Sequence, residues 1–199
     1  AIGIDGAIYY VAQAQFVQPQ IHAINKETGK LLWKTAPMEV PGVGSDIVVG
    51  NDGTVHIAAG HSIYAFDHKT GENKWIWEVP ETLPNPDDPD QMVSTRAGLS
   101  YLALTDDGNL ITTTGSSGSY YRGIYGVTKN GKKYFHNLKA VGTSANGGLS
   151  IGKNNTAYYF AKGLTLKEMG DYIIALNVST GQIKWSRRVL SYAAGSNTI

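Results

Sequence analysis

Short runs rich in Val, Ile, Thr and Tyr alternate along the chain with turn sequences that contain Gly, Asn or Asp, a pattern typical of strands joined by tight turns. One phrase of this kind returns in four copies, each an apolar strand, a turn that ends in Gly, and a polar strand with a large aromatic residue. The copies cover residues 21–33, 63–75, 124–135 and 173–185; the third is one residue shorter and has Phe in place of Trp. Such self-similarity predicts a repeat architecture.

A second phrase precedes each copy, at residues 4–10, 51–57, 106–112 and 153–159. Its Asp-Gly or Asn-Asn pair suits the positive φ angles of a two-residue hairpin turn. The Thr-Gly phrase predicts a second hairpin, so each repeat is a meander of four antiparallel strands. If these strands are lettered A to D outward from a common axis, Asp-Gly joins A to B and Thr-Gly joins C to D. This arrangement is a β-propeller blade.

A large ring stands four residues after the turn glycine in every copy, as Trp33, Trp75, Phe135 and Trp185. Burying such a ring between two blades removes roughly 150–250 Å² from water. The Ala or Gly of strand C leaves room for a neighbour. Because one blade alone cannot bury these faces, we expect the rings to dock each blade against the next.

The phrase Ala-x-Asp/Asn-x-x-Thr-Gly-x-x-x-Trp resembles the tryptophan-docking motif of PQQ-like propeller repeats, and the resemblance covers nearly the whole chain. The resemblance implies a family whose members range from quinoprotein alcohol dehydrogenases to outer-membrane assembly scaffolds, sensor domains and surface glycan-binding proteins. The fold therefore does not select a function.

We expect an all-β protein, a single β-propeller domain of about four consecutive four-stranded antiparallel blades. The blades are expected at residues 1–36, 44–79, 98–138 and 147–189, with residues 190–199 beginning the next. Four blades would leave two open sheet edges, and propellers of this type usually close with about six to eight blades. We therefore expect the chain to be part of a larger ring. A self-closing ring of four blades is the alternative.

The long insertions all fall in the B–C and D–A connections, at residues 13–20, 80–97, 115–122 and 162–171. These connections share one face of a propeller, and loops on a rigid scaffold commonly carry function. Aromatic rings, amides and guanidinium groups there suit stacking on sugars or gripping a peptide. The candidate ligand-binding residues are Gln15, Phe16, Gln18, Arg96, Tyr120, Tyr121 and Arg122. The alternatives are free drift of loop length and packing between loops.

The charge balance does not indicate a class of partner, because the chain has 17 Lys and Arg residues and 16 Asp and Glu residues. It gives no basis for a nucleic-acid track or an anionic membrane surface, and no apolar run approaches the roughly 20 residues that cross a bilayer. The absence of cysteine excludes disulfides, thiolate zinc sites and cysteine nucleophiles from this stretch. We expect an extracytoplasmic protein whose targeting segment lies outside the chain.

No catalytic residue and no metal site is expected. The acidic loop at residues 84–90 holds three prolines that restrict convergence on calcium, and the sequence has no Gly-x-Ser-x-Gly phrase. The histidines fall on strands or turns without metal-ligand spacing; they are His22, His56, His61, His68 and His136.

We therefore expect a non-catalytic binding or scaffold module without a cofactor, which binds a glycan, peptide or protein and contacts the remaining blades of its own propeller. The resemblance implies one alternative, a fragment of a quinone-dependent dehydrogenase with calcium-bound PQQ on the axis and an Asp as base. The chain departs from that pattern because it has no adjacent cysteine pair and its inner strands carry little acid. A third possibility is a scaffold whose partner adds a strand or packs at a blade edge.

Overall fold

A computed structural model of the chain describes residues 1–115, 121–140, 144–145, 148–162 and 171–190. These residues form strands arranged in four larger sheets, which we call the first to fourth blades, and one two-stranded sheet. The first blade holds β1 (Ile8–Ala12), β2 (Gln20–Ile24) and β3 (Leu31–Lys34); the second holds β4 (Val48–Val49), β5 (Val55–Ala59), β6 (Ser62–Phe66) and β7 (Asn73–Glu78).

The third blade holds β10 (Leu99–Leu104), β11 (Leu110–Thr114), β12 (Ile124–Val127) and β13 (Lys133–Asn137). The fourth holds β14 (Ser144–Ala145), β15 (Ser150–Gly152), β16 (Thr156–Lys162), β17 (Asp171–Asn177) and β18 (Ile183–Leu190), and β8 (Thr82–Pro84) pairs with β9 (Met92–Ser94). Each blade is an antiparallel meander in chain order, which confirms the predicted all-β propeller fold.

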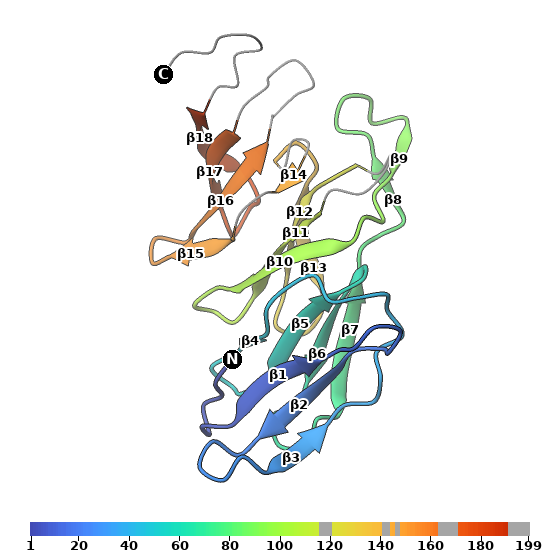
Figure 1. Ribbon diagram of the computed structural model, residues 1–199. Helices are drawn as coiled ribbons and strands as arrows, with labels where there is room; N and C mark the ends of the chain where they lie inside the picture. The colour runs from blue at the N-terminus through green and yellow to red at the C-terminus, as the bar shows by residue number, and fades with distance from the viewer. Residues whose placement is uncertain (116–120, 141–143, 146–147, 163–170, 191–199) are drawn as a thin grey trace, which may run out of the picture.

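The innermost strands are the least regular. In the first blade, strand A is reduced to an isolated bridge between Ile2 and Ile8, and in the fourth blade β14 and β15 pair with different parts of β16. Figure 1 shows the blades following one another from the β1–β3 sheet at the bottom of the view to the β16–β18 sheet at the top.

The A–B turns differ from the predicted two-residue hairpins. In the second blade the amide of Gly50 donates to the carbonyl of Thr54 at 2.9 Å, which leaves three residues in the turn. Only the last of them, Gly53, lies in the left-handed region, at φ 83°. This is the three-residue hairpin that ends in a left-handed residue, and Asn155 takes that place in the fourth blade at φ 57°.

The Asp or Asn of the repeated phrase organises the C–D turn. The Oδ1 atom of Asp67 accepts hydrogen bonds from the amides of Lys69 and Thr70, and Asn25 does the same for Glu27 and Thr28. Such side-chain bonds satisfy amides that the turn leaves without a strand partner. They explain why the phrase requires a short polar side chain at this place.

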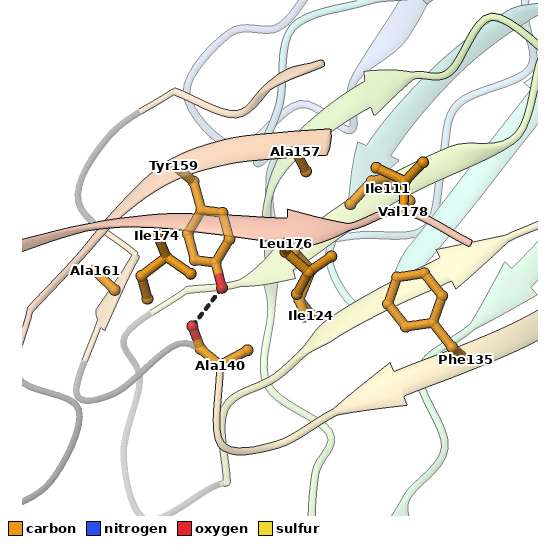
Figure 2. Close-up of a cluster of buried hydrophobic side chains, with 10 residues drawn as sticks. All are labelled: Ile111, Ile124, Phe135, Ala140, Ala157, Tyr159, Ala161, Ile174, Leu176 and Val178. Atoms are coloured by element: carbon orange, nitrogen blue, oxygen red, sulfur yellow. Dashed lines mark hydrogen bonds between the residues drawn. The ribbon is translucent and has the colours of Figure 1, made fainter. Parts of the chain in front are cut away.

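Three hydrophobic clusters make up the described core, and each lies between consecutive blades. The cluster between the third and fourth blades, shown in Figure 2, combines residues of β11, β12 and β13 with residues of β16 and β17. Its buried Tyr159 donates its hydroxyl hydrogen to the carbonyl of Ala140 at 2.6 Å. Burial therefore costs this polar group little.

The repeated aromatic rings lie against the C–D turn of the following blade. Trp33 donates from Nε1 to the carbonyl of His68 at 2.7 Å, and Trp75 donates to the carbonyl of Lys129 at 3.0 Å. The ring of Trp33 covers the turn glycine so closely that a methyl group on Gly71 would lie 2.5 Å from its Cε3 atom. Each tryptophan thus combines apolar burial with a directed hydrogen bond.

The third blade makes the same contact with two side chains. Phe135 lies over Gly181 but has no donor, and the neighbouring Tyr134 donates its hydroxyl hydrogen to the carbonyl of Val178 at 2.7 Å. Val178 stands at the position in its turn that His68 has in the second blade. The Phe substitution is therefore compensated by the residue before it.

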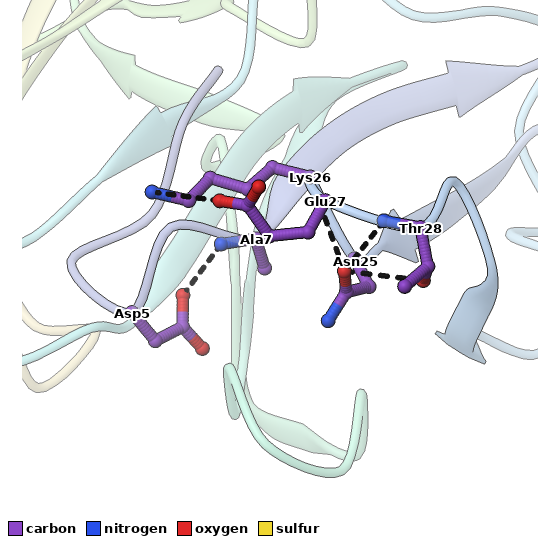
Figure 3. A network of polar contacts seen from close by, with 6 residues as sticks. All are labelled: Asp5, Ala7, Asn25, Lys26, Glu27 and Thr28. Carbon is purple, nitrogen blue, oxygen red and sulfur yellow. Dashed lines mark hydrogen bonds and ion pairs between the residues drawn. The ribbon is translucent and has the colours of Figure 1, made fainter.

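The C–D turn of the first blade and the aromatic ring of the fourth blade have no docking partner within the described residues. The turn of the first blade, drawn in Figure 3, is held by Asn25 and by an ion pair between Lys26 and Glu27, and a methyl group on Gly29 would meet nothing within 4 Å. At the other end Trp185 is 48% exposed and contacts Tyr158 of its own blade.

We predict that Gly71→Ala destabilises the 199-residue chain more than Gly29→Ala does. Both glycines have positive φ, so each alanine costs about 1–2 kcal/mol in backbone strain. Only at position 71 does the added methyl group also collide with a docked ring, which adds about 1–3 kcal/mol. Urea unfolding followed by circular dichroism measures both values. Equal losses would contradict the docking geometry.

Candidate functional site

The long connections gather on one face of the molecule. Figure 1 shows the β1–β2 loop and the β8–β9 hairpin on the side opposite the short β15–β16 and β10–β11 turns. We call this side the long-loop face and define it by residues 13–19, 35–47, 79–98, 115 and 121–123. The sequence predicted the insertions that begin at residues 13, 80 and 115, but not the connection at residues 35–47. Most of the predicted insertion at residues 162–171 lies outside the described residues, and the remaining B–C connection, between β5 and β6, is a tight turn at Gly60 and His61.

Main-chain hydrogen bonds tie the connections of this face to one another. The amide of Met38 donates to the carbonyl of Pro19 at 2.9 Å, which joins the loop after β3 to the loop after β1. The amide of Leu99 donates to the carbonyl of Gly60 at 2.8 Å, which joins the second and third blades. The loops are therefore positioned by the scaffold.

The β8–β9 hairpin was not foreseen from the sequence, where its residues read as an acidic, proline-containing loop. Across its base Arg96 and Glu81 form an ion pair, and Thr95 donates its hydroxyl hydrogen to the carbonyl of Pro80. At its far end Asp87 pairs with Lys139 at 2.7 Å, which holds the hairpin against the third blade. Leu83 and Val93, which pair across the hairpin, are the apolar residues that could have indicated strands here.

Part of the predicted ligand set comes together beside this hairpin. The amide of Tyr121 donates to the carbonyl of Ser94 at 2.8 Å, two residues from Arg96, and the ring of Tyr121 is 37% exposed. Arg122 is half-buried, and its Nε atom is buried without a hydrogen-bond partner in the described part of the chain. The predicted residue Tyr120 lies outside the described residues.

The other predicted residues form a separate tip between β1 and β2. Gln15, Phe16 and Gln18 are all exposed, and Phe16 is 98% exposed at φ 64°. The neighbouring Val17 is 57% exposed. An apolar side chain in full contact with water on a strained backbone is costly, since a residue other than Gly in the left-handed region loses about 1–2 kcal/mol.

One buried histidine, His56, packs against a tryptophan that docks two blades together, away from the long-loop face. Each B strand places one residue opposite the small residue of strand C, as Tyr9 opposite Ala23, His56 opposite Ala65 and Tyr158 opposite Ala175. The ring of His56 packs on Trp75 at 5.6 Å between centroids, as Tyr9 packs on Trp33. His56 thus takes the place of a tyrosine in the inter-blade packing.

Burial keeps His56 uncharged. The side chain is 2% exposed, and removal from water lowers its pKa from the usual 6.5 to about 4, although the Asp52 carboxylate and the backbone of Val48 favour the charged form. The Lys74 ammonium group adds a smaller lowering. The imidazole is therefore neutral at neutral pH.

The described residues do not fit a calcium–quinone centre. The described innermost strands, β4, β10, β14 and β15, contain no Asp or Glu, and within the described ranges no three His, Asp or Glu side chains gather where a metal ion could bind. Within the same ranges no helix has the length and apolar character that crossing a membrane requires.

The fold and the docking contacts define the chain as PQQ-like β-propeller repeats. A family model described as outer membrane protein assembly factor BamB matches residues 2–120. This match covers more than half of the chain, and the chain belongs to this family.

Similarity to individual proteins extends over almost the whole chain. Tetrathionate hydrolase of Acidithiobacillus ferrooxidans is 25% identical over 92% of this chain and 35% of its own length. The crystal structure of BamB from Moraxella catarrhalis has a TM-score of 0.51 at 17% identity, over 92% of this chain and 50% of that one. Quinohemoprotein alcohol dehydrogenase from Comamonas testosteroni has a TM-score of 0.62 at 16% identity, over 92% and 33%. The chain thus spans half or less of these relatives.

We predict that His56 makes the protein less stable in mild acid. Its pKa is about 6.5 unfolded and about 4 folded, so the unfolded state binds more protons between these values and stability falls as pH falls through this window. The expected loss from this group is about 2 kcal/mol between pH 7 and pH 5. Urea unfolding at each pH measures it.

The matched variant is His56→Tyr, which carries the residue found at the same place in the first and fourth blades. Other groups titrate equally in both proteins, so the difference between them isolates His56. If the variant and the parent protein lose the same stability between pH 7 and pH 5, the histidine is not held neutral.

Proposed function

We propose that the protein containing this chain is a non-catalytic propeller scaffold that binds a protein partner through the long-loop face. Binding of a peptide or a glycan at this face would also be a non-catalytic binding function. The proposal concerns the Phe16–Val17 tip together with the surface of Arg96, Tyr121 and Arg122.

The observation that carries the proposal is the Phe16 side chain, almost wholly exposed on a backbone in the left-handed region. Both the backbone strain and the exposure of the ring are unfavourable in the free protein. Burial of the ring in a partner's apolar pocket would remove the cost of its exposure. Aromatic side chains on exposed tips are the usual anchors of protein interfaces. Met92 of the hairpin, 59% exposed, adds apolar surface on the same face.

The family supports a scaffold as well, since its description names an assembly factor of outer membrane proteins. By the same description we propose an extracytoplasmic location. We further propose that other blades complete the ring, because the turn at Gly29 and the ring of Trp185 are the two halves of a docking contact and neither is filled by a described residue.

A hydrolase is the second candidate, favoured by the similarity to tetrathionate hydrolase over 92% of the chain. Assay of the full-length protein with tetrathionate separates the two candidates. Turnover at a rate proportional to protein concentration would favour the hydrolase, and its absence in a protein that still binds its partner would favour the scaffold.

The test of the scaffold uses the tip itself. We predict that a photoreactive amino acid at position 16 cross-links one partner protein, whereas the same group at position 31 does not. Leu31 is 52% exposed on β3, outside the long-loop face, so both probes reach solvent but lie on different parts of the surface. Mass spectrometry of the adducts identifies the partner.

With that partner purified, Phe16→Gly should weaken binding by about tenfold or more, as loss of an interface anchor does. The fold should keep its stability or gain some, because glycine adopts positive φ without strain. Leu31→Ser is the control and should bind as the parent does. Unchanged affinity of Phe16→Gly would rule out the tip as the anchor.

A further inference from the structure

An apolar groove opens between the first and second blades. It has a volume of about 590 Å³ and lies between the segment that follows β3 and the side of β6 and β7 that faces the first blade. The apolar side chains that line it are Pro37, Met38, Tyr64, Phe66 and Ile76. Because Met38, Tyr64 and Phe66 also belong to the hydrophobic cluster shared by these two blades, the groove continues an interface between blades to the surface.

The corresponding place between the second and third blades is filled by a tryptophan. Trp77 pairs with Ile63, two residues after the docking Trp75, and its ring packs on Tyr125 at 5.6 Å between centroids. Tyr125 is the counterpart of Tyr64 in the repeated phrase and is wholly buried. In this interface the ring of one blade therefore covers the tyrosine of the next.

The first blade has Thr35 where the second has Trp77. The amide of Thr35 donates to the carbonyl of Ile21 at 2.9 Å, and Ile21 is the counterpart of Ile63, so the two positions are equivalent in register. The hydroxyl of Thr35 accepts a hydrogen bond from the amide of Ile21 and stays close to its own strand. Tyr64 is accordingly left half-buried, and its ring stacks only on Phe66 of the same blade, at 6.1 Å.

The strand beside the groove has a free edge. β7 is the last strand of its sheet, and no strand of the described ranges pairs with its outer side (Figure 1). Such an edge presents amides and carbonyls that can bind an extended segment of another chain. Alternate side chains of a segment added to β7 would point to the same side as Ile76, which is 50% exposed and lines the groove.

The polar residues of the lining also suit a protein partner. Lys34, Glu39 and Glu72 are all exposed and carry charges of both signs. A protein interface commonly has an apolar centre and a polar, solvent-accessible rim. The groove therefore suits a neutral ring carried by a peptide backbone.

We propose that the groove binds an extended segment of a partner protein, which pairs with the edge of β7 and inserts one aromatic side chain beside Tyr64, as Trp77 lies beside Tyr125. Residues 36–39 of the long-loop face line the groove, but Phe16 and Val17 do not. The proposal therefore does not rest on the Phe16–Val17 tip, and the two can fail separately.

The test is fluorine NMR of the full-length protein with the peptide acetyl-Thr-Val-Trp-Val-Thr-amide, whose indole carries fluorine at position 5. The fluorine signal should shift saturably, and the unlabelled peptide should reverse the shift, whereas the same peptide with alanine in place of tryptophan should not. Free 5-fluoroindole should bind at least about tenfold more weakly, because it cannot pair with a strand edge. Equal binding of the two would overturn the pairing with β7.

Two variants and a control locate the binding. Thr35→Trp supplies the ring that the second blade carries and should abolish binding of the peptide by filling the groove. Ile76→Glu should weaken binding by about tenfold, because it places a charge against the inserted ring. Leu32→Glu is the matched control, since Leu32 is 52% exposed on β3 and does not line the groove, and it should bind as the parent does.

Circular dichroism shows which variants are folded. Absence of binding to the parent protein would overturn the proposal. Undiminished binding by folded Ile76→Glu would overturn it as well, whether or not Thr35→Trp folds.

Discussion

The rest of the structure depends on the contact between an aromatic ring and the turn glycine of the next blade. The ring covers a place where a Cβ atom would not fit, and a donor beside it binds the turn carbonyl, as Trp33 does at Gly71 and His68. A blade cannot bury both of its faces alone, so this contact converts separate four-stranded sheets into one core. Where the ring lacks a donor, as at Phe135, the adjacent Tyr134 supplies it.

Because every blade must present the same turn to its neighbour, the edge that carries the turns is constrained. The opposite edge is not, and there the loops lengthen, a hairpin is added and Phe16 projects into water. The same constraint makes His56 unusual. It occupies the position that a tyrosine takes in the first and fourth blades, and its imidazole is buried and uncharged.

Much of the fold could be predicted because its signals are local. The Asp or Asn at the turn, the glycine after it and the aromatic ring recur at fixed spacing, and each performs its role within a few residues of chain. The predicted length of the A–B turn was wrong, because Asp-Gly suits both two-residue and three-residue hairpins. The β8–β9 hairpin was missed because each of its strands has three residues, too few for an alternating pattern.

The sequence by itself determined the repeat, the order of strands within a blade and the face on which long loops gather, because these follow from spacing along the chain. Only the tertiary structure decided which turn receives which ring, that the ring of Trp185 is left half exposed and that Tyr134 replaces a tryptophan donor. It also decided that His56 is uncharged, because the residues that bury its side chain come from two blades. The physical reason is that burial and hydrogen-bond satisfaction depend on neighbours distant in sequence, which no local pattern specifies.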